Sequence, residues 1–202
     1  AFSFLQVISH TLEIRPMLKV GLREHDKIQE AMLEFSDYIL EDEPSMYDPE
    51  YEEFLNSVKT ALMFNSWISE QDEEFLLEEY NIRPGELRAK TDRADWLLYA
   101  AEELSKIMHY QYLVKEIIKL RLRLKYGVKE ELLPLVKLRD IGRFRARRLY
   151  SAGLTTLQKL REIPTESLER LIGVKVAKSI KDQLAGKKTM KESQQINLES
   201  FR

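Results

Sequence analysis

The sequence of 202 residues contains no cysteine and few helix-breaking residues, with only seven glycines and six prolines. The absence of cysteine excludes disulfides, cysteine-ligated zinc sites and a thiol nucleophile, as expected of a protein from a reducing cytosol. So little glycine and proline argues against a turn-rich all-β protein and favours a helical one. No apolar run approaches ~18 residues and no signal peptide opens the chain, so we expect no membrane span. Ala1 in place of an initiator methionine is expected of a fragment or a processed product.

Motifs for catalysis are also missing. None of the glycines forms a G-x-x-x-x-G-K-[ST] phosphate loop or a G-x-G-x-x-G turn. His10, His25 and His109 stand alone, without a second ligand at the spacing that zinc sites use. No serine or threonine has an evident histidine partner for nucleophilic catalysis. We therefore expect no catalytic residue, no metal and no cofactor in this chain.

The formal net charge is only −2, but the charged residues are distributed unevenly along the sequence. Residues 1–80 hold 19 acidic and 5 basic side chains, whereas residues 81–202 hold 15 acidic and 27 basic ones. The stretch from Lys115 to Arg148 alone carries a net charge of +8. Such asymmetry points to a polyanionic partner for the second half, nucleic acid first of all. The alternative is that the two halves attract each other.

Helical spacing of apolar residues runs through most of the chain and predicts an all-α fold. Pro84 is expected at the start of a long helix, where its missing N–H is not needed. Ser69, followed by Asp72 three residues later, predicts the start of a separate helix earlier in the chain. The segment Lys119–Lys125 alternates like a strand, but its helically spaced neighbours favour a basic helix. The first three predicted helices carry their apolar residues at Phe4, Leu5, Ile8 and Leu12; at Ile28, Ala31, Met32, Phe35 and Ile39; and at Tyr51, Phe54, Leu55, Val58 and Leu62.

The long helix predicted from Pro84 to about His109 carries two aromatic residues away from its apolar face. At 100° per residue, Leu87 and the other apolar residues form one stripe, whereas Trp96 and Tyr99 fall on the polar side. They are expected either to be covered by a neighbouring helix or to stack on unpaired bases, since every base has a π face. The remaining residues of the stripe are Ala94, Leu97, Leu98, Ala101, Leu104 and Met108.

An Ile-Gly-x-x-x-Ala element occurs twice, with Gly142 and Gly173 separated by 31 residues. An Ile-Gly turn that opens a helix is typical of helix-hairpin-helix modules, in which the N–H groups of the new helix meet a phosphate. The alanine allows the two helices to pack closely. Only the first copy is rich in arginine, so the second is expected to be a structural partner. A helical domain without a ligand is the alternative. We expect one helix from Lys129 to Val136 before the first copy.

Several stretches together resemble the C-terminal region of archaeal Hjm helicases, which are superfamily 2 DNA helicases related to the HelQ proteins of animals. The resemblance covers residues 1 to about 185. It implies a helical ratchet bundle over 1–127, a helix-hairpin-helix DNA-binding domain over 128–185 and a flexible tail over 186–202. The matching stretches are Ile14-Arg15-Pro16, Glu78-Glu79-Tyr80, Pro84-Gly85-Glu86, Ala94-Asp95-Trp96-Leu97, Tyr126–Leu132 and Ile141–Tyr150.

The resemblance also implies roles for individual residues. Trp96 matches a tryptophan that stacks on the bases of translocating single-stranded DNA. The family has an arginine about two turns earlier, where this sequence has Ala89, with Arg88 beside it and Arg93 one turn before Trp96. The hairpin domain resembles a DNA-binding brake, whose glycine turn would be Gly142 and whose arginines would be Arg139, Arg143, Arg145, Arg147 and Arg148.

The last residues resemble a sliding-clamp (PCNA) interaction box, with Gln195, Leu198 and Phe201 at the expected spacing and Arg202 in place of the second aromatic residue. In one helical turn, Leu198 and Phe201 would fill an apolar pocket of the clamp. An inert tail is the alternative.

The function implied is the part of an ATP-dependent 3′–5′ DNA helicase that binds single-stranded and forked DNA, in an archaeal cytoplasm at the nucleoid. Replication-fork, recombination and repair roles are expected of the parent enzyme. ATP and Mg²⁺ would belong to its motor domains, which this part would contact. A helical protein-binding adaptor is the alternative, and a nuclease or glycosylase lacks the carboxylate site it would need.

Overall fold

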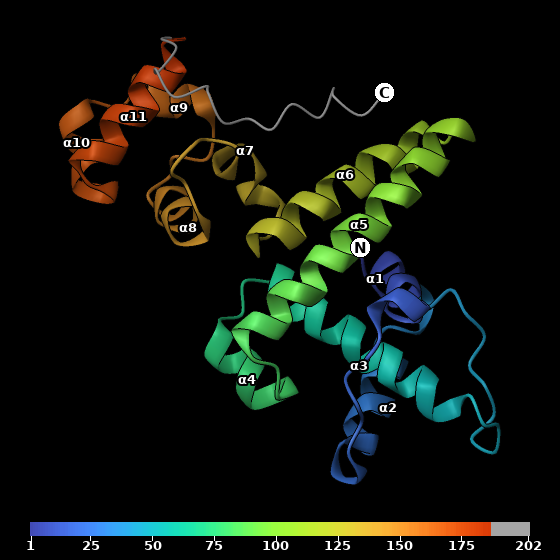
Figure 1. Cartoon of the computed structure of the whole chain (residues 1–202). Coiled ribbons are helices and arrows are strands. Elements are labelled where there is room, and N and C mark those ends of the chain that lie inside the picture. Colours follow the sequence, from blue (N-terminus) through green and yellow to red (C-terminus); the bar gives the residue numbers. More distant parts are fainter. Residues whose placement is uncertain (187–202) are drawn as a thin grey trace. The chain divides into compact units, whose positions relative to one another are not determined.

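The computed structural model describes residues 1–186 and contains eleven α-helices, four short 3₁₀ turns and no strand within that range (Figure 1). The predicted all-α class is therefore confirmed. The chain divides into two compact units, Ala1–Glu130 and a second that begins at Glu131. Each unit is described by itself below.

The first unit is built around α3 (Tyr51–Ile68), which packs against α1 (Phe2–Ser9), α2 (His25–Glu34), α4 (Glu73–Tyr80) and α6 (Gln111–Tyr126). Both predicted apolar faces of α3 and α1 are buried, with Phe54 and Leu5 among the residues that are fully enclosed. Leu12 differs from the prediction: it lies in a 3₁₀ turn after α1 has ended and is exposed.

Helix starts in this unit follow from local chemistry. The carboxylate of Asp72 accepts a hydrogen bond from the backbone N–H of Phe75 at 2.8 Å and caps α4, whereas Ser69 lies at the end of α3. Pro84 occupies the first turn of α5 (Pro84–Ile107), as its missing N–H predicts. The carboxylate of Glu86 accepts the backbone N–H of Arg83 at 3.1 Å and completes this start.

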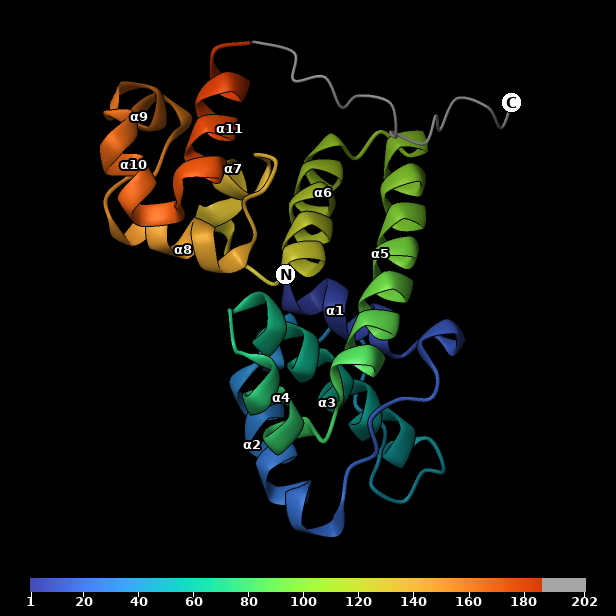
Figure 2. The ribbon, with the colours of Figure 1, turned by 60° about the vertical axis from the view of Figure 1, so that its left-hand side comes forward.

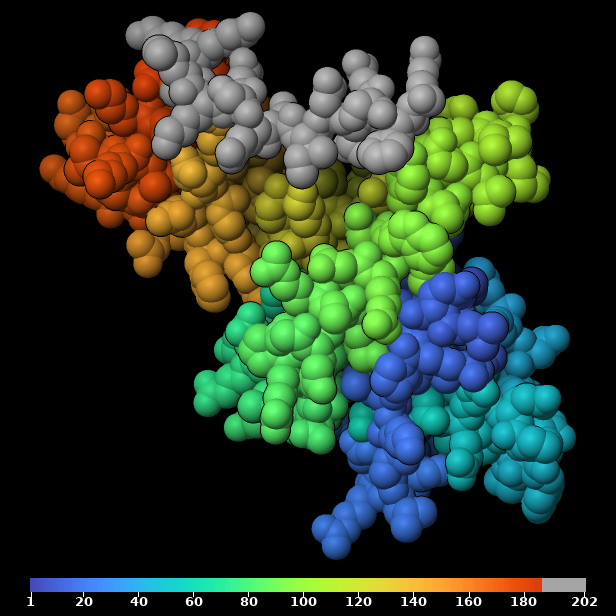
Figure 3. All heavy atoms as spheres, in the orientation of Figure 1, coloured from blue at the N-terminus to red at the C-terminus, as the bar shows by residue number. Residues whose placement is uncertain are grey.

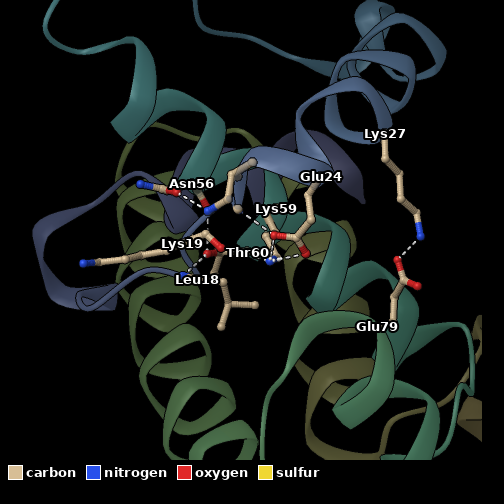
Figure 4. Close-up of polar contacts among 10 residues, drawn as sticks. Leu18, Lys19, Glu24, Lys27, Asn56, Lys59, Thr60 and Glu79 are labelled. Carbon is tan, nitrogen blue, oxygen red and sulfur yellow. Dashed lines mark hydrogen bonds and ion pairs between the residues drawn. The ribbon is translucent and has the colours of Figure 1, made fainter.

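The segment that links α1 to α2 is held against α3 by three side chains that lie within about one turn of that helix (Figure 4). Asn56 accepts the N–H of Val20 at 2.7 Å, and Thr60 accepts the N–H of Leu18 at 3.0 Å. Lys59, almost fully buried, donates to the carbonyl oxygen of Lys19 and to the carboxylate of Glu24. The buried ammonium group of Lys59 and the N–H groups of Leu18 and Val20 thus all have hydrogen-bond partners, as burial requires.

Helices α5 and α6 form an antiparallel pair that extends away from the other helices of the unit (Figure 2). Lys119–Lys125 lies within α6, so the helical interpretation of that alternating segment is confirmed. Leu104 and Met108 were predicted to be buried, but they are 59% and 57% exposed. The apolar stripe of α5 is longer than the core that covers it, because among the described helices of the first unit only α6 runs beside the far end of α5. That end of the α5–α6 pair projects from the rest of the unit (Figure 3).

The second unit contains five short helices, α7 (Leu133–Val136), α8 (Arg143–Ser151), α9 (Leu157–Glu162), α10 (Thr165–Ile172) and α11 (Val174–Leu184). Helices α10 and α11 pack together, and α10 also contacts α8. The single helix expected from Lys129 to Val136 is instead a 3₁₀ turn over Glu130–Leu132 followed by α7. Pro134 lies in the first turn of α7, where proline is tolerated. The predicted tail beyond residue 186 lies outside the described residues.

Candidate nucleic-acid interface

Trp96 projects from the middle of α5 on the side away from the core, and 59% of its surface is exposed. Three residues later, Tyr99 is 47% exposed. The residues behind them, Ala94 and Leu98, are completely buried. The orientation derived from helical spacing is therefore correct for both aromatic residues. An indole with this much accessible apolar surface can receive a planar ligand.

Tyr99 is bordered by a guanidinium group from the neighbouring helix. The Cζ of Arg121, on α6, lies 4.9 Å from the centre of the Tyr99 ring, within cation–π range. Arg121 donates from Nε to Asp95 at 2.8 Å and from Nη1 to Glu102 at 2.7 Å, and both carboxylates belong to α5. These bonds hold the planar group in place over the ring.

The surroundings of Arg121 and Glu102 favour the charged form of each of these two side chains. Hydrogen bonds with Asp95, and then with Glu102, raise the pKa of Arg121 despite its partial burial. Burial by itself would raise the pKa of Glu102, but hydrogen bonds from Lys106 and Arg121 hold that pKa below its usual value. Since the side chain of Glu102 is only 7% exposed, its carboxylate is tied to its two cationic partners.

The two arginines expected near Trp96 occupy different surroundings. Arg93, one turn before Trp96, donates from Nη1 to the carbonyl oxygen of Arg15 at 2.9 Å and is exposed. Arg88 lines an open hollow of about 680 Å³ together with Trp67, Asp92 and Lys125. Trp96 does not line that hollow, and it lies ~80° around the axis from Arg88. Arg93 is therefore the nearer of the two along the helix.

Arginines of the second unit gather on α8 and the turn that precedes it. Arg147 pairs with Glu131 at 2.9 Å, and its guanidinium lies 5.1 Å from the ring centre of Tyr150. Arg145 and Arg148 donate to backbone carbonyl oxygens of Asp140 and Leu171, at 3.0 and 3.1 Å. All of the expected α8 arginines thus lie in one short helix, each at the surface or half-buried: Arg143, Arg145, Arg147 and Arg148.

Both Ile-Gly turns open a helix, as predicted, but their glycines differ. Gly173 precedes α11 with φ +88°, a conformation that favours glycine. Gly142 precedes α8 with φ −93° and ψ −178°, which any residue adopts, and a Cβ there would meet nothing within 4 Å. The backbone conformation therefore explains Gly173 but not Gly142, and packing explains neither, since a Cβ on Gly173 would also meet nothing within 4 Å. Close approach of a ligand to the α8 N-terminus would explain it.

Comparison with known proteins assigns the first unit to a family. The family described as archaeal helicase, domain 4, matches residues 2–127. The chain belongs to this family. The resemblance to archaeal superfamily 2 helicases is thereby confirmed, and Trp96, Tyr99 and Arg121 all lie inside domain 4.

Similarity to whole proteins continues beyond domain 4. The chain is 35% identical over 181 residues to the ATP-dependent DNA helicase Hel308 of Methanococcus vannielii, across 88% of this chain and 22% of that protein. It is 36% identical to the protein of that name from Pyrococcus horikoshii, across 87% and 24% of the two chains. The Caldivirga maquilingensis protein is 38% identical, across 83% and 23%. The chain therefore spans less than a quarter of the length of these relatives.

Sequence reasoning missed the contacts that position the site. The pair Glu102–Lys106 could be found from its i, i+4 spacing, but the reach of Arg121 to Asp95 crosses between helices and leaves no sequence pattern. In the second unit, Gln183 on α11 accepts from the N–H of Arg139 at 2.9 Å and donates to its carbonyl oxygen at 3.3 Å. Helix α11 thus supports the loop that precedes α8.

Within residues 1–186, none of the helices combines the length and the hydropathy that a membrane span would need.

Proposed function

We propose that this chain binds single-stranded DNA within an ATP-dependent DNA helicase, with Trp96 stacking on unpaired bases. The observation that carries the proposal is the exposure of Trp96 on the outer face of domain 4. Within a duplex both faces of a base are covered by the neighbouring base pairs, whereas the bases of a single strand can leave their stack and place a face on an indole. Stacking of this kind tolerates any base, as a helicase requires.

In this proposal, the second unit binds the phosphates of the DNA backbone. The N-terminus of α8 presents backbone N–H groups beside a glycine without a side chain, and arginines surround it. This combination is typical of a helix-hairpin-helix contact with the DNA backbone. The residues proposed for it are Arg139, Gly142, Arg143, Arg145, Arg147 and Arg148. Arg88 and Arg93 are proposed as further DNA contacts on the stacking helix α5 itself.

The wider role follows from the relatives, whose names describe ATP-dependent DNA helicases. We propose that the parent enzyme unwinds forked DNA with 3′–5′ polarity at replication forks and in recombination and repair, at the nucleoid in the cytoplasm of an archaeal cell. ATP and Mg²⁺ would bind in motor domains outside this chain. The chain itself would hydrolyse nothing and would contact those motor domains.

The test is titration of the chain with a dye-labelled oligothymidylate, followed by anisotropy and by tryptophan fluorescence at two salt concentrations. We expect binding that weakens with salt and quenching of Trp96, since the other indole, Trp67, donates to the carbonyl oxygen of Leu124 and is half-buried. Trp96→Ala should remove the quenching and weaken binding by about 1–3 kcal/mol. If the wild type fails to bind any oligonucleotide, the protein-binding adaptor becomes the better explanation.

We also propose that Gln195, Leu198 and Phe201 bind a sliding clamp. Their spacing supports this proposal, and they lie outside the residues that the structure describes. Calorimetry of a peptide spanning 190–202 with the clamp should give micromolar binding that is lost on Leu198→Ala with Phe201→Ala. Absence of heat with the wild-type peptide would overturn it.

A further inference from the structure

Tyr99 has the placement that a second stacking residue would need. It follows Trp96 by three residues, so the two side chains leave α5 ~4.5 Å apart along the axis and ~60° apart around it. Both are substantially exposed, at 59% and 47%. Tyr99 lies on the side of Trp96 that is nearer to α6, because Arg121 of α6 covers it. Two neighbouring aromatic surfaces therefore face solvent on the same part of domain 4.

The guanidinium of Arg121 is arranged to support a ring rather than to grip a phosphate. Its Nε and Nη2 edge faces Asp95, at 2.8 and 3.3 Å, and its Nη1 donates to Glu102 at 2.7 Å. Three of its five N–H groups are thus bonded to carboxylates, including both N–H groups of the Nε–Nη2 edge, which is one of the edges that could hold a phosphate in a bidentate contact. The flat face of the group lies over Tyr99.

The charges around the two aromatic residues also favour bases over phosphates. Asp92 and Glu103 share the outer face of α5 with Trp96 and Tyr99, as do Arg88 and Lys106. Lys106 pairs with Glu102 and Glu103, and Arg121 pairs with Asp95 and Glu102. The face therefore has no excess of positive charge to attract a phosphate. A neutral base meets an apolar ring instead, and its sugar–phosphate backbone can point away from the helix.

We propose that Tyr99, held from behind by Arg121, is a second base-stacking position, so that α5 receives two neighbouring unpaired bases, one on Trp96 and one on Tyr99. The inference rests on the proposed function, because it assumes that Trp96 meets single-stranded DNA. Arg121 is a positioning residue in this arrangement and touches the ring rather than the DNA.

The test compares two labelled probes of equal length, an oligothymidylate and an abasic strand that keeps only sugars and phosphates. Tyr99→Ala should weaken binding of oligothymidylate about 5- to 100-fold, the effect of one base stack, and leave binding of the abasic strand within about twofold. The dependence of affinity on salt should keep its slope, because the protein still binds the same phosphates. Tyr99→Phe should bind like the wild type, since the ring is retained.

Tyr112→Ala is the matched control, because Tyr112 is 75% exposed on α6 and has no guanidinium over its ring in the described structure. It should bind both probes like the wild type.

Arg121→Lys keeps the positive charge but not the flat face of the guanidinium, and it should weaken oligothymidylate binding less than Tyr99→Ala. In a variant that already carries Tyr99→Ala, Arg121→Lys should not change DNA binding further, because Arg121 affects binding only by positioning the Tyr99 ring.

The outcomes separate this inference from the proposed function. If Trp96→Ala weakens binding and Tyr99→Ala does not, the second stacking position is wrong and the proposed function stands. If Tyr99→Ala weakens binding of both probes equally, Tyr99 has a structural role and the inference is overturned. If neither substitution changes binding of oligothymidylate, the proposed function fails together with the inference.

Discussion

The indole ring of Trp67 occupies the space that a side chain at Gly127 would need. A Cβ on Gly127 would lie 2.6 Å from the Cε2 and Cζ2 atoms of that ring, closer than any real contact. The same indole donates from Nε1 to the carbonyl oxygen of Leu124 at 2.7 Å, in the last turn of α6. The end of α6 is thereby fixed against α3, which carries Trp67.

We expect Gly127→Ala to destabilise the first unit by about 2–5 kcal/mol. Gly127 has φ +62°, where an alanine costs about 1–2 kcal/mol, and the clash with Trp67 adds an overpacking penalty of about 1–3 kcal/mol. Urea unfolding followed by tryptophan fluorescence measures this effect, because both tryptophans, Trp67 and Trp96, lie in the first unit. Two other glycines serve as controls. Gly153→Ala, at φ +81° in open space, should show strain without a clash; it lies in the second unit, which has no tryptophan, so its unfolding is followed by circular dichroism. Gly85→Ala within α5 should be neutral or stabilising. Equal losses for Gly127→Ala and Gly153→Ala would mean that the ring moves aside freely.

Gly142 and Gly173 should respond in opposite ways to substitution. Gly142→Ser should keep or raise stability, because serine is a preferred N-cap and the backbone there is extended. The same change should weaken DNA binding, since the hydroxyl takes up the N–H groups that a phosphate would use. Gly173→Ala should lower stability by about 1–2 kcal/mol because of its positive φ. Circular dichroism and anisotropy on both variants measure the two effects. A Gly142→Ser variant with unchanged affinity would argue against a phosphate at α8.

Neutralising Arg143, Arg145 and Arg147 together should weaken binding to all sequences alike, because contacts to phosphates position a strand without reading its bases. For single strands, the slope of log K against log salt should flatten by about 0.7 for each phosphate that the protein no longer neutralises. Changing Lys175 and Lys178 to glutamine is the matched control, since these residues lie on α11 after the second glycine turn. A loss of equal size in the control would show that overall charge, rather than α8, is responsible. In the parent helicase, normal binding with faster unwinding would identify the α8 arginines as a brake.

Local patterns in the sequence predicted the helical class and several helix starts, but not the interactions between helices. Asp72 and Pro84 mark helix starts because capping is decided within four residues. Helical spacing gave the side of α5 on which Trp96 lies, but it left open whether another helix covers that side, and the structure shows Trp96 exposed. Leu104 and Met108 were wrongly assigned to the core, because spacing predicts which side of a helix is apolar but not how far its neighbours extend. The contacts of Arg121 with Asp95 and Glu102 join two helices, and the contact of Trp67 with Gly127 joins residues 60 positions apart. Such contacts depend on tertiary packing, which no short window of sequence contains.

Glu102→Gln should lower the stability of the first unit by about 1–3 kcal/mol near neutral pH, because it removes a buried charge that accepts hydrogen bonds from Arg121 and Lys106. The pKa of Glu102 is lower in the folded protein than in the unfolded chain, so the folded state holds fewer protons on it as the pH falls. Its stabilising effect is therefore complete above about pH 4.3, the ordinary value for glutamate, and is lost as the pH falls through the folded pKa. Urea unfolding of wild type and variant at several pH values should show a difference in unfolding free energy that shrinks on acidification.

Glu103→Gln is the matched control. Glu103 is adjacent to Glu102, contacts the same Lys106 at 2.7 Å and is 43% exposed. Its substitution should therefore change the unfolding free energy by no more than about 0.5 kcal/mol at every pH. A difference for Glu102→Gln that does not vary with pH would mean that shape, and not charge, holds the cluster together.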